Sequence, residues 1–547
     1  MRRALLIISM AALVAKVHGQ EGITFDRLLK TAAEPQNWLT YSGDLGGQRH
    51  TRLTQITPAN VRQLEQQWVF QAQSLEKFEA TPLAVDGVVY TVQAPNDVVA
   101  IDGATGRVFW TYAHANSTQV RPCCGRVNRG LAILRDTLFM GTLDGFLIAL
   151  DARDGRELWK VRVAGARPEA GYAFTVAPLV VKDRVIVGPA GGDFGIRGFI
   201  AAFDAATGAE VWRFYTVPAT GEPGNDTWAG ASWRTGGAAI WTTGTYDPET
   251  NLTFWGTGNP GPDWNGDSRM GDNLYADSVV ALDADTGRLK WHFQFTPHDE
   301  FDYDATQVPV LADVQLQGRR RKAMLFANRN GLWYVLDRTT GEFLSGKPFT
   351  KVTWTTGLDG KGRPLDVVSP TPEGLRVYPH VVGGTNWYSP SYSPRTGLFY
   401  VPAWMDTSAT FVKSPVEYVE GRAFLGTLPG GTTLRAEGKA INRRLPSEGY
   451  GAILALDPRT GERAWMFRMD DVTDAGVLST ATDLVFSGGR EGFFFALDAK
   501  TGAPLWKANV GGLVQAGPMS YAIGQRQYVA VAAGHSLFAY ALRQADR

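Results

Sequence analysis

The chain has 547 residues, which is long enough for several ordinary domains or for one large repeat architecture. Its 54 basic and 54 acidic residues balance, so charge gives no indication of binding to nucleic acid or to an anionic membrane. The 62 glycines, 29 prolines and 17 tryptophans predict many short strands joined by tight turns, and they argue against long helices.

The N-terminus has the pattern of an export signal. Arg2 and Arg3 are followed by an apolar run over residues 5–15, which is too short to span a bilayer, and by small residues suited to cleavage. We expect residues 1–19 to be removed and residues 20–547 to form one soluble, periplasmic domain. An uncleaved anchor is the weaker alternative, because no second apolar segment of spanning length follows.

One phrase recurs along the chain: a short apolar strand ending in Asp, a Gly a few residues later, and often a Trp four residues after the Gly. Four of the spacings between successive aspartates, 49, 53, 54 and 41 residues, are close to the length of one propeller blade of about 40–50 residues. The longer gaps indicate insertions between strands. The aspartates are Asp102, Asp151, Asp204, Asp283, Asp337, Asp457 and Asp498.

The two ends of the chain each carry half of the same phrase. Trp68 resembles a docking Trp with no turn before it, and the strand at 536–542 has no turn after it. Together they would complete one blade, which predicts an all-β, eight-bladed propeller closed by its N- and C-terminal strands. Two separate β-sandwiches would not explain these half-blades. Ser345 stands where one Trp is expected, and residues 403–449 are predicted to cross one end of the ring.

Residues 298–304 hold four carboxylates directly after a strand-like run at 289–295. Asp302 and Asp304 alternate around an aromatic residue, so in an extended chain both side chains point the same way. Two such carboxylates repel each other unless a cation or a shared proton intervenes. The stretch therefore predicts a metal site, a general base or both, and the competing interpretation is a solvated acidic turn.

The two cysteines, Cys123 and Cys124, are adjacent, and no Cys-x-x-Cys-His motif for a covalent haem occurs in the sequence. They could be free thiols, intermolecular links or a bond to each other. A bond between neighbours is strained, because Cα atoms about 3.8 Å apart are closer than the usual disulfide span of roughly 4.4–6.8 Å.

The repeat, the adjacent cysteines and the acidic stretch together resemble the pyrroloquinoline quinone (PQQ)-dependent alcohol dehydrogenases, the group that includes methanol dehydrogenase. The resemblance covers essentially the whole chain after the signal. It implies an enzyme that oxidises an alcohol to the aldehyde by hydride transfer to metal-bound PQQ.

The resemblance also implies a set of cofactor contacts. A disulfide between Cys123 and Cys124 would lie flat against the quinone, Arg129 would bind a PQQ oxygen, and Trp241 would cover the opposite face. The alternative for Trp241 is another blade-docking Trp. The other cofactor positions implied by the likeness are Glu79, Thr175, Gly191, Gly192, Arg329, Asn386 and Trp387.

The family's metal pattern matches Asn259 and Asp302, while Asp193 stands where the family normally has Glu. Asp193 is one methylene shorter, so bidentate reach is in question. Asp304 follows the pattern of the lanthanide-dependent enzymes, which carry a second Asp two residues after the catalytic one. A hard, highly charged ion suits an additional anionic oxygen. We therefore expect a lanthanide, with calcium as the alternative.

In the mechanism that the resemblance implies, Asp302 removes the hydroxyl proton and Arg329 supports the charge that develops on the quinone oxygens. A separate periplasmic cytochrome c is the expected electron acceptor, the substrate is expected to be a small alcohol, and neither nucleic acid nor stable membrane insertion is expected. The alternatives are a non-enzymatic propeller that serves as a binding or assembly scaffold, and a PQQ enzyme for sugars, polyols, aldehydes or polymeric alcohols.

Overall fold

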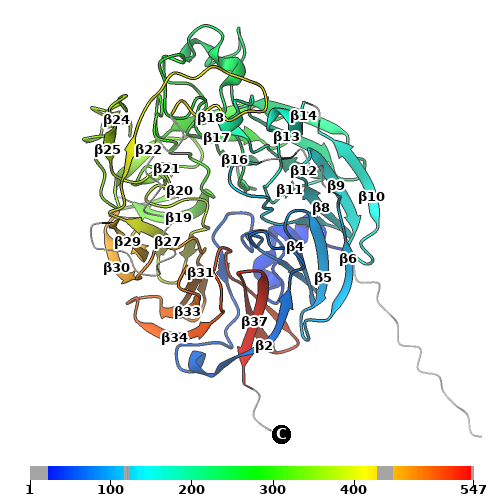
Figure 1. Ribbon diagram of the computed structural model, residues 1–547. Coiled ribbons are helices and arrows are strands. Elements are labelled where there is room, and N and C mark those ends of the chain that lie inside the picture. The colour runs from blue at the N-terminus through cyan, green and yellow to red at the C-terminus, as the bar shows by residue number, and fades with distance from the viewer. Residues whose placement is uncertain are drawn as a thin grey trace, which may run out of the picture.

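The computed structural model describes residues 22–115, 120, 122–163, 165–316, 318–427 and 448–543. The described residues form a ring of blades around a central axis (Figure 1). Seven blades have four antiparallel strands, and in the remaining blade the short strand β1 (His50–Thr51) adds a fifth, parallel to its neighbour. The predicted export signal and residues 428–447 of the predicted crossing segment lie outside the described residues. Within the described ranges, no helix is both long and apolar enough to cross a membrane.

Eight blades make up the ring in the described part of the chain, as the repeat predicts. The first blade contains β3 (Leu83–Val85), β4 (Val88–Gln93), β5 (Asp97–Asp102) and β6 (Val108–Tyr112), and the second contains β7 (Ala132–Leu134), β8 (Thr137–Gly141), β9 (Phe146–Asp151) and β10 (Glu157–Arg162). The third blade contains β11 (Leu179–Val181), β12 (Arg184–Val187), β13 (Phe199–Asp204) and β14 (Glu210–Tyr215). The fourth contains β15 (Thr245–Asp247), β16 (Leu252–Gly256), β17 (Ser278–Asp283) and β18 (Leu289–Gln294). The fifth blade contains β19 (Val310–Leu316), β20 (Arg319–Ala327), β21 (Leu332–Asp337) and β22 (Phe343–Pro348). The sixth contains β26 (Ser391–Ser393), β27 (Leu398–Met405), β29 (Tyr450–Leu456) and β30 (Arg463–Arg468). The seventh contains β31 (Leu478–Thr480), β32 (Leu484–Gly488), β33 (Phe493–Asp498) and β34 (Pro504–Asn509).

The two ends of the chain close the ring. The last blade joins β2 (Leu64–Gln71) to β37 (Ser536–Leu542), and β36 (Arg526–Ala533) and β35 (Met519–Ile523) follow in the same sheet. The strand from the N-terminal part of the chain thus completes the blade that the C-terminal strands begin, and the ring has no gap at the seam. The predicted closure is confirmed.

The recurring Trp and Gly form the joint between neighbouring blades. A Cβ added to Gly106 would stand 2.8 Å from Trp68, and one added to Gly155 would stand 2.5 Å from Trp110, so no larger side chain fits beneath either ring. Both glycines have positive φ, which other residues adopt at a cost. The indole Nε1 atoms donate to backbone oxygens of the next turn, as in Trp68 to Gly103, Trp110 to Ala152, Trp159 to Ala205, Trp212 to Ala284 and Trp465 to Ala499.

The joint that lacks its Trp at Ser345 is filled by a lysine. The aliphatic stem of Lys347 lies over Gly461, about where an indole lies in the other joints, and its Nζ pairs with Glu462 at 2.6 Å. A lysine stem can cover apolar surface while its charged end stays in water. The blade contact is thus kept by a different side chain.

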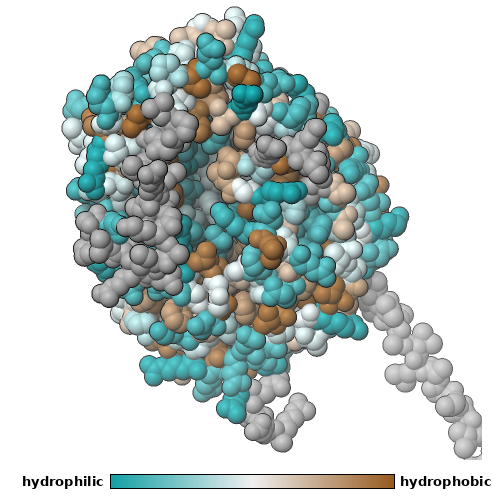
Figure 2. Space-filling model, viewed as in Figure 1, coloured by the Kyte–Doolittle hydropathy of each residue, from teal (hydrophilic) through white to brown (hydrophobic). Residues whose placement is uncertain are grey.

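Insertions between the strands gather over one face of the ring. Because β27 ends at Met405, the crossing segment begins three residues later than predicted. It contains β28 (Ala409–Phe411), which pairs with β25 (Leu375–Val377). Figure 2 shows this face, with a hollow near its middle. The remaining short elements are β1 (His50–Thr51), β23 (Gly357–Leu358), β24 (Pro364–Leu365), α1 (Phe25–Leu29), η1 (Thr31–Ala33), η2 (Val61–Gln63), η3 (Pro168–Ala170), η4 (Gly192–Phe194), η5 (Asn225–Thr227) and η6 (Ser232–Thr235).

Candidate functional site

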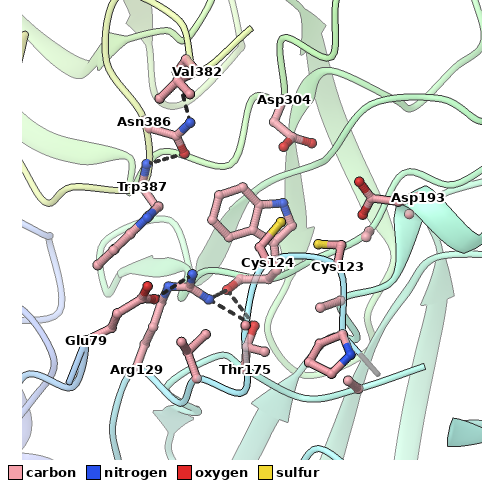
Figure 3. A pocket seen from close by; sticks show the side chains of 18 of the residues that line it. Glu79, Cys123, Cys124, Arg129, Thr175, Asp193, Asp304, Val382, Asn386 and Trp387 are labelled. Carbon is pink, nitrogen blue, oxygen red and sulfur yellow. Dashed lines mark hydrogen bonds and ion pairs between the residues drawn. The ribbon is translucent and has the colours of Figure 1, made fainter. Parts of the chain in front are cut away.

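One cavity of about 280 Å³ brings together all of the predicted site residues (Figure 3). Several of them lie just before the first strand of a blade, as Arg129 does before β7 and Trp241 does before β15. The cavity is lined by Glu79, Cys123, Cys124, Arg129, Thr175, Gly191, Gly192, Asp193, Trp241, Asn259, Asp302, Asp304, Arg329, Asn386 and Trp387.

Arg129 organises one end of the cavity, which we call the Arg129 end. Its guanidinium pairs with the Glu79 carboxylate at 2.9 Å and donates to Thr175 Oγ1 at 3.0 Å. It also lies over the rings of Trp241 and Trp387, 4.9 and 4.7 Å from their centroids. Trp241 therefore faces the cavity instead of a blade joint, and the docking interpretation of this residue is wrong.

Arg329 organises the other end, which we call the Arg329 end. Its Nη2 donates to Asp302 Oδ2 at 2.8 Å, and its Nη1 donates to Asp304 Oδ2 at 2.5 Å. Its Nε donates to the Val381 backbone oxygen at 2.8 Å, which fixes the plane of the guanidinium. One cation thus holds two carboxylates that the sequence predicted to point the same way.

The 298–304 stretch is buried except for the partly exposed His298 and Asp302, so the interpretation as a solvated acidic turn is wrong. Asp299 accepts the backbone N–H groups of Phe301 and Tyr303 at 3.0 and 2.8 Å, and Glu300 accepts the N–H of Gly266 at 2.7 Å. These two acids hold the loop in shape. Asp302 adopts the left-handed region at φ 59°, and the turn that results directs its carboxylate to Arg329.

Burial dominates the electrostatics of the Arg329 end. It raises the pKa of Asp302 well above the ordinary value, and nearby Asp304, Asp263 and Asp193 raise it further against the opposing effect of Arg329. Burial also raises the pKa of Asp304. For Arg329 burial acts downward, but the two carboxylates outweigh it and its pKa stays above the usual range. The end holds more negative charge than it can balance.

The predicted metal ligands are near one another but are not gathered into a finished site. Within the described part of the chain, no group of three or more His, Cys, Asp or Glu side chains is close enough together to hold a metal ion. Asp302 and Asp304 are both paired with Arg329. Asn259 Oδ1 lies beside Gly192, 3.5 Å from where a Cβ would stand, next to Asp193. The set is hard oxygen donors with surplus negative charge, which fits a hard cation completed by cofactor atoms.

Comparison with known proteins agrees with this geometry. Residues 38–353 match the family described as "Glucose/ethanol/alcohol dehydrogenase, beta-propeller domain". Residues 449–547 match the "Outer membrane protein assembly factor BamB" description, over the last blades. The quinohemoprotein alcohol dehydrogenase ADH IIB of Pseudomonas putida is 38% identical over 98% of this chain and 78% of its own length.

The chain belongs to the PQQ-dependent alcohol dehydrogenases, a family of oxidoreductases. The quinoprotein alcohol dehydrogenase PedH of Pseudomonas putida is 36% identical over 97% of this chain and 91% of its own length. A solved europium-containing methanol dehydrogenase is 32% identical, with a TM-score of 0.86, over 94% of this chain and all of that one. The predicted family and propeller fold are confirmed.

In this PQQ-dependent dehydrogenase the implied disulfide is not formed. Cys123 and Cys124 are both free thiols, and their side chains are exposed toward the cavity. A bond between these adjacent residues would be strained, because neighbouring Cα atoms are about 3.8 Å apart, closer than the usual disulfide span. The hydrogen bond with Cys124 raises the pKa of the Cys123 thiol, and the nearby Asp193 carboxylate adds to the rise.

The cavity also contains residues that the sequence did not indicate. Arg490 pairs with Asp474 at 2.8 Å and lies 4.9 Å from the centre of the Trp404 ring. Asp263 is buried behind the cavity wall, close enough to Asp302 to influence it. Arg490 lies in the turn between β32 and β33, and Asp263 lies in the insertion after β16, so no fixed spacing connects either residue to the site.

Proposed function

We propose that this PQQ-dependent dehydrogenase oxidises a small alcohol to the aldehyde, with Asp302 as the base. The observation that supports this most directly is the pairing of Asp302 with Arg329 at 2.8 Å on the wall of a cavity that also contains Arg129 and Trp241. The cavity of about 280 Å³ must hold cofactor and substrate together, which favours a small alcohol over a sugar or a polymer.

When bound, PQQ with its cation would supply the hydride acceptor and the Lewis acid. The chain's own residues would do the rest. Arg129, held by Glu79 and Thr175, would bind an anionic oxygen of the cofactor between two indole rings. Arg329 would steady charge on the reactive oxygens, and Asp302 would take the hydroxyl proton on its carboxylate oxygen.

For the cation we propose a lanthanide rather than calcium. Asp193, Asn259, Asp302 and Asp304 would supply oxygen ligands, and only Arg329 forms an ion pair with any of the three acids in the described residues. A trivalent ion offsets more of this charge than a divalent one. Relatives named as lanthanide-dependent or europium-containing methanol dehydrogenases support the same choice.

We also propose that residues 1–19 direct export to the periplasm and that residues 20–547 act there as a single propeller domain. We further propose a separate cytochrome c as the electron acceptor; the 547 residues carry no Cys-x-x-Cys-His motif.

The test is to add PQQ with La³⁺ or Ca²⁺ to the purified protein and to follow dye reduction by short primary alcohols, with glucose as a comparison substrate. Asp302→Asn should lower kcat by at least about a thousandfold, because the base is lost while the shape is kept. The matched control is Asp366→Asn, another Asp with left-handed backbone, exposed and accepting from Thr356. Undiminished turnover by Asp302→Asn would contradict the proposed base.

A further inference from the structure

Asp263 is a buried carboxylate without a proper partner. It lies in the loop after β16, its side chain is 0% exposed, and neither of its carboxylate oxygens has a hydrogen-bond partner among the described residues. An ionised carboxylate in this setting costs several kcal/mol unless another charge compensates for it. Such a residue needs a cation, and the loop that carries it also carries Asn259.

The nearest hydrogen-bonding group is the Asn259 amide. It is close enough to lower the pKa of Asp263 against the dominant effect of burial, although no well-formed bond satisfies either oxygen. The two ends of the amide face different groups. Oδ1 lies beside Gly192, while Nδ2 has a long contact of 3.4 Å to the Pro260 oxygen. An amide that offers Nδ2 to Asp263 presents its oxygen, the atom that binds cations, to the Asp193 turn.

Arg269 is the nearby cation, but its donors are occupied elsewhere. They bind the backbone oxygen of Pro262 at 3.0 and 3.2 Å, the backbone oxygen of Asp299 at 2.5 Å and the Asn273 side chain at 2.8 Å. The other charges that act on Asp263 are those of Asp193 and Asp304, and both repel it. Among these charges, the repulsion by two acids is opposed by the single cation Arg269.

We propose that Asp263 is a positioning residue of the cation site: it orients the Asn259 oxygen toward the cation and adds one negative charge that favours a trivalent ion. This inference rests on the proposed function, since it concerns the same cation.

The expected effect of Asp263 is larger for a trivalent ion than for a divalent one. Residues that orient metal ligands typically change metal affinity by about 10–100-fold. Since Coulomb energy is proportional to the charge of the ion, the same change for Ca²⁺ is two-thirds as large in free energy, or on the order of 5–20-fold. Loss of Asp263 should thus weaken both ions and lower the preference for the trivalent one.

The experiment titrates Tb³⁺ into the full chain loaded with PQQ, following luminescence excited through nearby indoles, and repeats the titration with Ca²⁺ as competitor. Asp263→Asn should lower the Tb³⁺ affinity by about 10–100-fold and the Ca²⁺ affinity by less. The matched control is Asp267→Asn in the same loop, whose exposed carboxylate pairs with Lys413 and should leave both affinities unchanged.

Thermal unfolding of the protein without cofactor separates this role from a structural one. Removing an unpaired buried charge should leave the apo variant as stable as the wild type or more stable. An Asp263→Asn protein that unfolds at lower temperature, fails to fold, or binds both ions as the wild type does would overturn the role of Asp263. Failure of the wild type to bind either ion with PQQ would instead remove the cation site itself, and the proposed function with it.

Discussion

The two ends of the cavity are each built on a buried arginine, but they are balanced differently. At the Arg129 end, one guanidinium faces one carboxylate, Glu79, at 2.9 Å. At the Arg329 end, one guanidinium faces both Asp302 and Asp304. At the Arg129 end the two charges are balanced and the indole rings of Trp241 and Trp387 line the wall, which suits the binding of an aromatic anion. The Arg329 end has surplus negative charge, which suits a cation and a proton acceptor.

Replacing each arginine in turn is the strongest test of whether the two ends have different roles. Arg329→Gln leaves two buried carboxylates uncompensated, so we expect the apo protein to lose about 3–5 kcal/mol of unfolding free energy. Its turnover per bound PQQ should fall by about 100–1000-fold, because the donor to the developing charge is gone. Urea unfolding and dye reduction measure the two effects.

Arg129→Gln is the matched variant at the other end. It leaves one carboxylate, Glu79, without its partner, so we expect weaker retention of PQQ, measured by absorbance after gel filtration, and nearly normal turnover for each PQQ that stays bound. Equal losses of turnover per bound PQQ in the two variants would mean that the two ends do not differ in role.

The sequence predicted the parts of this molecule that repeat or that sit close together in the chain. The Asp, Gly and Trp phrase predicted the ring because each joint uses the same contact, as Trp68 over Gly106 illustrates. Asp302 and Asp304 were predicted to share a direction because they are two residues apart, and a single guanidinium binds both.

What the sequence could not predict depends on loops that meet only in the folded chain. Asp263 and Arg490 reach the site region from loops with no fixed spacing to the other site residues. Lys347 takes the role of the missing Trp, although it lies two positions after the place where the repeat would put that Trp. It can do so because the joint needs only an apolar surface over Gly461. The sequence also did not predict the burial of Asp299 and Glu300. Asp299 accepts from local backbone N–H groups, and Glu300 accepts from the distant Gly266.

The surplus of acids at the Arg329 end should also make the stability of the apo protein depend on pH. Burial raises the pKa of Asp299 to about 7, and it also raises the pKa values of Asp302 and Asp304. The folded state then keeps protons that the unfolded chain loses above about pH 4, so stability is greatest at low pH and falls as pH rises through about 7. Asp299 alone would account for up to about 4 kcal/mol, at 1.36 kcal/mol for each pKa unit.

Urea unfolding between pH 5 and 8, with and without PQQ and La³⁺, measures this dependence. The loaded protein should show a flatter profile, because a bound cation holds the carboxylates ionised in the folded state. Asp299→Asn should flatten the apo profile as well. Apo stability that rises with pH over this range would contradict the assignment of the surplus charge to the Arg329 end.

The smallest expected effect tests whether Asp304 alone makes the two ends different. Asp304→Ala leaves Arg329 with Asp302 in a one-to-one pair, as Arg129 is with Glu79. With one anionic group fewer, the preference for La³⁺ over Ca²⁺ should fall by about tenfold. Dialysis of the PQQ-loaded protein against both ions, followed by metal analysis, measures the ratio. Thr175→Ala, a comparable truncation at the Arg129 end, should leave it unchanged; if Asp304→Ala does so too, the choice of ion rests with Asp193 and Asp263.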